Sequence, residues 1–140
     1  MITKGLFSSN KDDWETPKDL FEKLNEEFKF TLDPCCSNEN KKCKKFYTKK
    51  ENGLLKDWKG ETVYVNPPYG KELPKWVKKC YEEWLFNNTK IVMLIPARTD
   101  TKYFHEFIYH KAKIRFIKGR LKFSNSKNSA PFPSMIVIYE

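Results

Sequence analysis

The stretch Asn66-Pro67-Pro68-Tyr69, which directly follows the apolar run Val63-Tyr64-Val65, constrains the fold of this chain more than any other feature. A run of β-branched and aromatic residues is typical of a buried strand. The two prolines end that strand, because neither can donate a backbone N–H to a sheet. The residue before a proline is held extended. The sequence therefore predicts a stiff turn at the carboxyl end of a strand, where ligands bind in an open α/β sheet.

The groups on this turn are suited to holding a planar amine. Asn66 carries an acceptor oxygen and an NH2 donor, whereas Pro67 offers only a carbonyl. Two acceptors converging on one amino group would bind both of its hydrogens, as in the exocyclic amine of a base or a carboxamide nitrogen, and Tyr69 could stack on the planar group. The competing interpretation is a Pro-Pro turn that only ends a strand, with Tyr69 packed in the core. The preceding strand and the following Gly70 favour a functional site.

Predicted strands and helices alternate along the rest of the chain. We expect strands at 28–32, 45–48, 61–65, 91–95, 114–117 and 135–139, and helices after Thr16-Pro17, at 73–86 and at 100–110. Thr16 is expected to cap the first helix and Pro17 to occupy its first turn. This alternation predicts an α/β fold with a parallel-rich sheet. The length of 140 residues predicts a single domain, 1–140, in which residues 1–12 form a flexible tail.

The charge balance favours a polyanionic partner. The chain has 27 Lys and Arg against 18 Asp and Glu, for a net charge of +9. Eight basic residues lie between Lys102 and Lys127, where Glu106 is the only acidic residue and aromatic residues are interleaved. A solvated lysine-rich surface is the alternative interpretation. Beside a site for a base amine, a nucleic acid is the better interpretation.

Several classes of protein are disfavoured by the composition. The four cysteines, Cys35, Cys36, Cys43 and Cys80, form no C-x-x-C pair, and there are only two histidines, so we expect no metal site and reduced thiols. No apolar run approaches the roughly 20 residues of a membrane span. The start of the chain has no apolar signal core. We therefore expect a cytoplasmic protein.

Further motifs occur in a fixed order along nearly the whole chain, and together they resemble a known family. Asn-Pro-Pro-Tyr is the catalytic motif of amino-methyltransferases that use S-adenosylmethionine, and this chain is most similar to the small phage-type DNA N6-adenine methyltransferases of the Dam family. The motifs are Trp14-Glu15-Thr16-Pro17, Thr31-Leu32-Asp33-Pro34, Asn66-Pro67-Pro68-Tyr69-Gly70, Leu94-Ile95-Pro96-Ala97-Arg98-Thr99-Asp100-Thr101, Gly119-Arg120-Leu121-Lys122-Phe123 and Ala130-Pro131-Phe132-Pro133-Ser134.

The resemblance implies a compact Rossmann-like methyltransferase fold, with a mostly parallel sheet, an antiparallel C-terminal strand and helices on both faces. It also implies S-adenosylmethionine as cofactor and DNA as partner, in a bacterial host cell and encoded by the host, a phage or a prophage. The oligomeric state is left open.

The cofactor-binding residues implied by the resemblance lie in the N-terminal half: Trp14, Thr16, Pro17, Asp33, Pro34, Cys35 and Asn52. Asp33 would contact the cofactor's ammonium, position the loop after the first strand, or simply cap a helix. Trp14 would cover the sulfonium by a cation–π contact or pack in the core. Where such folds usually carry glycines that let the backbone approach the cofactor, this chain has Cys35-Cys36-Ser37-Asn38.

The implied reaction is a direct displacement on an adenine swung out of the helix. Its catalytic residues are Asn66, Pro67, Pro68 and Tyr69, with the N6 amine held between Asn66 and the Pro67 carbonyl. The substrate-binding residues are Arg98, Arg120, Phe123 and Phe132. Phe132 or Phe123 would cover the face of the base opposite Tyr69, and the two arginines would contact phosphate or bases, although Arg98 could equally be a structural ion-pair partner. No metal and no covalent nucleophile are needed.

Two other functions stay open from the residues. The same tetrapeptide serves transfer to a glutamine amide, so methylation of RNA or of a protein glutamine is one alternative. The second is a non-catalytic nucleic-acid-binding domain that kept the fold.

Overall fold

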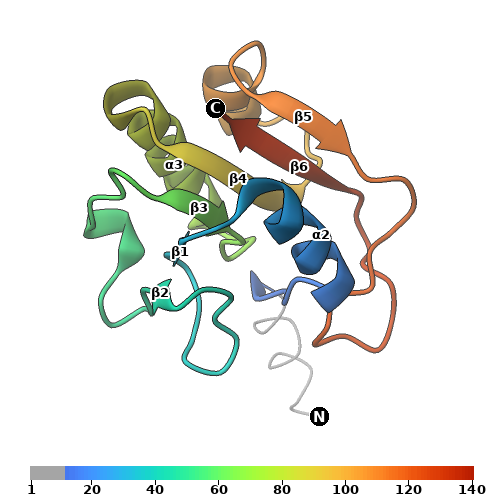
Figure 1. Cartoon of the computed structure of the whole chain (residues 1–140). Helices are drawn as coiled ribbons and strands as arrows, with labels where there is room; N and C mark the ends of the chain where they lie inside the picture. The colour runs from blue at the N-terminus through green and yellow to red at the C-terminus, as the bar shows by residue number, and fades with distance from the viewer. Residues whose placement is uncertain (1–11) are drawn as a thin grey trace.

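A six-stranded sheet in the order β2-β1-β3-β4-β6-β5 forms the centre of the computed structural model, which describes residues 12–140 (Figure 1). The parallel strands are β1 (Leu32–Asp33), β2 (Lys45–Phe46), β3 (Thr62–Val65) and β4 (Lys90–Pro96). The C-terminal strand β6 (Ser134–Tyr139) runs antiparallel to β4 and to β5 (Lys113–Phe116). The predicted α/β fold, with a mostly parallel sheet and an antiparallel C-terminal strand, is confirmed.

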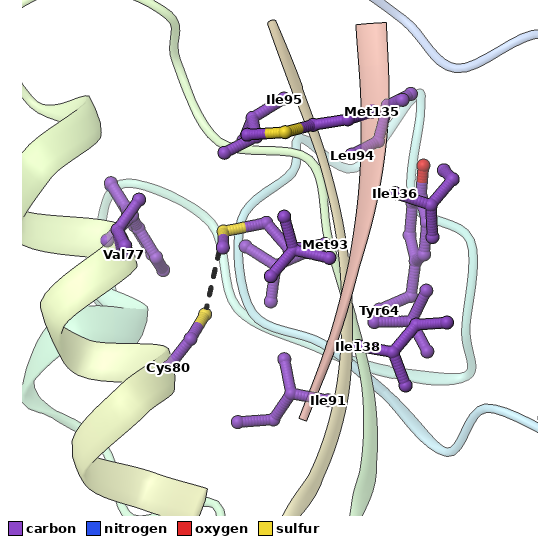
Figure 2. Packing of buried hydrophobic residues seen from close by; sticks show 14 of the residues in the cluster. Tyr64, Val77, Cys80, Ile91, Met93, Leu94, Ile95, Met135, Ile136 and Ile138 are labelled. Atoms are coloured by element: carbon purple, nitrogen blue, oxygen red, sulfur yellow. Dashed lines mark hydrogen bonds between the residues drawn. The ribbon is translucent and has the colours of Figure 1, made fainter. Parts of the chain in front are cut away.

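Helices cover both faces of the sheet, as predicted for a Rossmann-like fold (Figure 1). On one face, Phe21 of α2 (Lys18–Phe28) packs against Tyr64 of β3, with ring centroids 5.1 Å apart. On the other, Cys80 of α3 (Leu73–Asn87) approaches Met93 of β4. Figure 2 shows Met93 on the α3 side of the sheet and Tyr64 on the opposite side. Two short helical segments, η2 (Gly53–Leu55) and η3 (Phe104–Ile108), connect the strands.

The core is centred on β4, whose side chains from Ile91 to Ile95 are fully buried. This strand lies between β3 and β6, so its continuous apolar run contacts the layers above and below the sheet. The register pairs Met93 with Val137 and Leu94 with Ile136, and paired residues point to the same face. A strand buried on both faces holds the neighbouring strand β3, and the turn that follows it, in a fixed place.

The structure corrects three local predictions. Of the strand predicted at 28–32, only Leu32 lies in a strand, because Phe28 is the last residue of α2 and Lys29 caps that helix in a left-handed conformation with φ of 60°. The helix predicted at 100–110 is shorter, since residues 102–108 are helical, and Phe104–Ile108 within it form the π-helical segment η3. Thr16 does not cap α2, since Pro17 is the N-cap residue and no side chain caps this helix. Of the predicted tail, residues 1–11 lie outside the described part of the chain.

Within residues 12–140, no helix is long and apolar enough to cross a membrane.

The burial of Met93 leads to a stability prediction. Met93→Ala should lower the free energy of unfolding by about 2–5 kcal/mol, because it leaves a cavity between β4 and α3. Phe86→Ala is the control on α3, since 74 % of Phe86 is exposed, and should change stability by no more than about 0.5 kcal/mol. Urea unfolding monitored by tryptophan fluorescence measures both, and equal effects would contradict this description of the core.

Candidate functional site at the carboxyl ends of β1 and β3

A cavity of about 860 Å³ lies at the carboxyl edge of the sheet. In the sheet, β2 lies on one side of β1 and β3 lies on the other. The chain leaves β1 toward β2 and leaves β3 toward β4, so these two connections run in opposite directions from the space between β1 and β3. Such a switch point is where ligands bind in open α/β sheets. Most of the predicted site residues contribute to the lining: Trp14, Thr16, Asp33, Pro34, Cys35, Asn52, Asn66, Pro67 and Pro68. Six predicted residues do not line it: Pro17, Tyr69, Arg98, Arg120, Phe123 and Phe132.

The carboxamide of Asn66 is held in one orientation at the wall of this cavity. Its Nδ2 donates to the backbone carbonyl of Trp14 and to Oγ1 of Thr16, at 3.1 Å from the latter. Its Oδ1 accepts a hydrogen bond of 2.7 Å from the hydroxyl of Tyr69. Because Pro67 and Pro68 directly follow, the backbone adds its own restraint. The amide therefore presents its oxygen and its nitrogen in opposite, defined directions.

Tyr69 packs in the core in this structure, since only 5 % of its surface is exposed. Its hydroxyl lies 2.7 Å from Asn66 Oδ1 and 3.0 Å from the carbonyl oxygen of Leu94, which share its single hydrogen. Burial raises the pKa of the Tyr69 hydroxyl well above its ordinary value. The phenol therefore stays protonated and acts as a donor to Asn66.

The N-terminal segment, residues 12–16, lies against the turn after β3, residues 66–69. The carbonyl of Asp12 accepts from the backbone N–H of Tyr69 at 2.8 Å. The side chain of Asn125 holds the other side of the segment: it accepts from Glu15 N at 2.9 Å and donates to Asp13 O at 3.0 Å. The segment thus joins the turn after β3 to the loop before β6.

Gly70 lies next to the side chain of Asp12. A Cβ atom at Gly70 would come within 2.3 Å of the Asp12 carboxylate. A larger residue would therefore require the exposed Asp12 side chain to rotate away.

An aromatic cluster formed by Trp14, Tyr69, Phe123 and Phe132 lies beside Asn66. The Trp14 ring is 5.3 Å from Phe123 and 5.1 Å from Phe132, in both cases edge-to-face. Tyr69 contacts the same two phenylalanines at 6.2 and 5.7 Å. The predicted substrate-binding residues Phe123 and Phe132 are thus brought to the turn after β3 from 54 or more positions away in sequence.

The two predicted arginines differ in their positions. The guanidinium of Arg98 lies 5.8 Å from the centre of the Phe132 ring, at the edge of the aromatic cluster. Arg120 is exposed three positions before Phe123.

Asp33 organises the loop that follows β1. Its Oδ1 accepts from Cys35 N at 3.3 Å and its Oδ2 from Lys42 N at 3.0 Å. Burial raises the pKa of this carboxyl to about 6, against the opposing effect of the two backbone donors. No helix begins directly after Asp33, so of the three roles considered for this residue the geometry matches the positioning of the loop. Burial also raises the pKa of the Cys35 thiol, which therefore stays protonated.

Asn52 and Gly53 bring a second loop against the end of β1. Asn52 adopts a left-handed conformation with φ of 60°, and its Oδ1 accepts from Leu54 N at 3.2 Å. A Cβ atom at Gly53 would lie 2.1 Å from the carbonyl oxygen of Pro34. The close backbone approach at this edge of the sheet is therefore made by Gly53.

Charged residues of both signs line the cavity. Acidic Asp13, Glu15 and Glu72 belong to the segments next to the turn after β3. The end of β1 and the loops after β1 and β2 contribute both acidic and basic residues: Asp33, Glu39, Lys42, Lys49 and Lys50. Within the described chain from residue 12 onward, no group of three or more His, Cys, Asp or Glu side chains is arranged to hold a metal ion.

Sequence reasoning missed several residues of this site. Tyr64 appeared only as a core residue of β3, yet its hydroxyl lies 2.6 Å from Thr16 Oγ1. Asn125 was not predicted because its partners are distant in the chain. Gly53 was not predicted because its neighbour is a backbone atom. The one available signal was the Asn52-Gly53 pair, which is typical of a tight turn.

Comparison with known proteins finds one family over nearly the whole chain. The family model described as DNA N-6-adenine-methyltransferase (Dam) matches residues 4–140. A DNA N-6-adenine-methyltransferase of Haemophilus phage HP1 (strain HP1c1) is 33% identical over 149 residues, covering 100% of this chain and 86% of that protein. A protein of the same description from Escherichia phage T1 is 38% identical over 113 residues, covering 79% of this chain and 47% of the phage protein.

The buried Asp33 carboxyl leads to a pH prediction. In ¹³C-labelled protein, the Cγ resonance of Asp33, assigned by its loss in Asp33→Asn, should titrate at a pKa of about 6 rather than 3.8. Because the folded-state pKa is raised, the folded chain binds this proton more tightly than the unfolded chain. The contribution of Asp33 to the free energy of unfolding should therefore fall as the pH rises from 3.8 to about 6 and stay constant above. A midpoint near 3.8 would contradict the buried placement.

Proposed function

Because the chain belongs to the DNA N-6-adenine-methyltransferase (Dam) family, we propose that it transfers a methyl group from S-adenosylmethionine to the N6 amine of adenine in DNA. The observation that carries this proposal is the fixed carboxamide of Asn66 at the wall of the cavity beside the aromatic cluster. It supplies an oriented acceptor for an amine, next to a space for a small molecule and next to rings that can hold a base.

The cavity fits S-adenosylmethionine in size and in chemistry. Its volume of about 860 Å³ lies in the range of roughly 300–1,000 Å³ found for small-molecule sites. The loop held by Asp33, with Pro34 and Cys35, and the Asn52 turn would hold the cofactor, with Trp14 and the acidic residues next to it suited to a cation. When bound, S-adenosylmethionine supplies an activated methyl group on a positively charged sulfur.

Asn66 and Pro67 would hold the hydrogens of the target amine. An amide oxygen has two lone pairs, so Asn66 Oδ1 can accept from the amine while it still accepts from Tyr69. The Pro67 carbonyl is the second acceptor, and Pro68 keeps it in place by restricting the backbone. Fixing both N–H bonds orients the nitrogen, so that proximity and alignment provide most of the rate enhancement.

An adenine has to leave the base stack to reach Asn66. We propose that it enters the aromatic cluster, where Tyr69, Phe123 and Phe132 provide rings for stacking. These rings touch one another in the present structure, so entry of the base requires the loop that carries Phe123 and Phe132 to move away from Trp14. Pro17 would act indirectly, since its carbonyl accepts from Phe21 N at the start of α2.

The basic C-terminal half supports DNA as the partner. Two of its basic residues, Lys113 and Arg115, form ion pairs with Glu140 and Glu27. Six others are exposed and suited to phosphate contacts: Lys102, Lys111, Lys118, Arg120, Lys122 and Lys127. Arg98, at the edge of the aromatic cluster, is the basic residue best placed to contact the nucleotide that enters the site.

The central test is substitution of Asn66. Purified protein with S-adenosylmethionine and adenine-containing DNA should produce N6-methyladenine, measured by mass spectrometry of nucleosides. Asn66→Ala should lower kcat by about a hundredfold or more, whereas S-adenosylmethionine binding measured by calorimetry should survive. The matched control is Asn87→Ala, because Asn87 lies on α3, does not line the cavity and bonds Glu83 at 3.0 Å. Undiminished activity of Asn66→Ala would refute the role of Asn66.

The choice of substrate is tested in the same assay. Methyl incorporation from labelled S-adenosylmethionine should be found in DNA and should be much lower in RNA and in protein. Preferential labelling of RNA, or of a protein glutamine, would refute DNA as the substrate. Failure to bind S-adenosylmethionine at all would support a non-catalytic nucleic-acid-binding domain.

A further inference from the structure

We infer that Thr16 and Tyr64 are positioning residues for Asn66, because their paired hydroxyls fix which end of its carboxamide faces the target amine. This inference rests on the proposed function and assigns residues to it that the family motif around Asn66 does not explain. It also gives the buried hydroxyl of Thr16 a role different from contact with the cofactor.

The three side chains form one chain of hydrogen bonds between two separate parts of the sequence, the N-terminal segment and the end of β3. Tyr64 Oη lies 2.6 Å from Thr16 Oγ1, and Asn66 Nδ2 lies 3.1 Å from the same oxygen. Both hydroxyl-bearing residues are only 1 % exposed, so water does not compete for the bond between their hydroxyls. Burial also raises the pKa of the Tyr64 hydroxyl, which keeps it available as a donor to Thr16.

The network fixes the direction of the amide. One hydrogen of Asn66 Nδ2 points to the Trp14 carbonyl and the other to Thr16 Oγ1. A flipped amide would place Asn66 Oδ1 against the Trp14 carbonyl oxygen, and two acceptors with no hydrogen between them repel each other. With Nδ2 held in this way, Oδ1 faces the Tyr69 side of the turn, where the aromatic cluster lies.

Tyr64 matters because a threonine hydroxyl can rotate. With the Tyr64 hydroxyl as donor, the lone pairs of Thr16 Oγ1 are shared between Tyr64 and Asn66. Without that donor, the Thr16 hydroxyl turns freely, and its own hydrogen can point at Asn66 Nδ2 for part of the time. The terminal torsion of an asparagine side chain is broad, so the carboxamide would then sample orientations that do not present Oδ1 to the amine.

The experiment compares five variants by steady-state kinetics with DNA and S-adenosylmethionine. Tyr64→Phe and Thr16→Val should each lower kcat by about tenfold, the scale of one lost hydrogen bond that acts on a reacting group. The KM for DNA and the calorimetric Kd for S-adenosylmethionine should change by less than about twofold, because neither hydroxyl binds substrate in this account. Thr16→Ser keeps the hydroxyl and should restore most of the kcat.

Tyr139→Phe is the matched control for Tyr64→Phe. Tyr139 is a fully buried tyrosine of the same sheet, and its hydroxyl bonds the carbonyl of Phe107 at 2.5 Å, outside the cavity lining. It should lose stability but keep kcat. The double variant Tyr64→Phe/Thr16→Val should be no slower than the slower single variant, since both changes act through one network.

A second readout does not depend on turnover. In ¹⁵N-labelled protein, the side-chain NH2 of Asn66, assigned by its loss in Asn66→Ala, should exchange slowly with solvent. Exchange should become faster in Tyr64→Phe and Thr16→Val and stay slow in Tyr139→Phe. If the wild-type chain methylates no adenine, the proposed function fails, whereas this exchange still tests the network.

Two results would overturn the inference. One is an unchanged kcat in an otherwise active Tyr64→Phe enzyme whose Asn66 NH2 exchange is also unchanged. The other is a Thr16→Val enzyme that keeps its kcat but binds S-adenosylmethionine much more weakly, because this would assign the Thr16 hydroxyl to the cofactor.

Discussion

The hydrogen bonds from Asn66 Nδ2 to Trp14 and Thr16 are the interaction on which the site depends. They join positions 52 and 50 residues apart in sequence, and they act on a turn that Pro67 and Pro68 already make stiff. The strand before this turn is held by its pairing with β4, whose side chains from Ile91 to Ile95 are fully buried. Rigidity therefore extends from the core, through the end of β3, to a single carboxamide whose orientation decides what it can bind.

The parts of the fold that could be predicted are those in which the local pattern of apolar residues matches one type of secondary structure. The apolar run at 91–95 and the helical spacing at 73–86 predicted β4 and α3 because each pattern matches one periodicity. Alternating phenylalanines at 28–32 fit both the end of a helix and a strand. Such a pattern does not predict the left-handed conformation of Lys29 that ends the helix. At 100–110, a helix was predicted, but not the π-helical conformation of Phe104–Ile108.

Within the site, the sequence indicated which residues matter better than how they act. Asp33 was recognised as important, but its role in tying Cys35 N and Lys42 N depends on a loop conformation that no pattern encodes. The missing glycines after Asp33 are another example. Gly53, twenty residues further along the chain, instead lets a second loop pack against the carbonyl of Pro34. Local sequence patterns do not identify hydrogen-bond partners that are distant in sequence, such as Asn125 and Asp13.

The most direct test of this account is a crystal structure of the protein with S-adenosylhomocysteine, the methyl-free product of the cofactor. We expect the ligand in the cavity between the carboxyl ends of β1 and β3, against the loop held by Asp33 and the turn at Asn52. Asn66 Nδ2 should still lie within hydrogen-bond distance of the Trp14 carbonyl and Thr16 Oγ1. A ligand bound elsewhere, or an Asn66 carboxamide turned away from Thr16, would contradict the account.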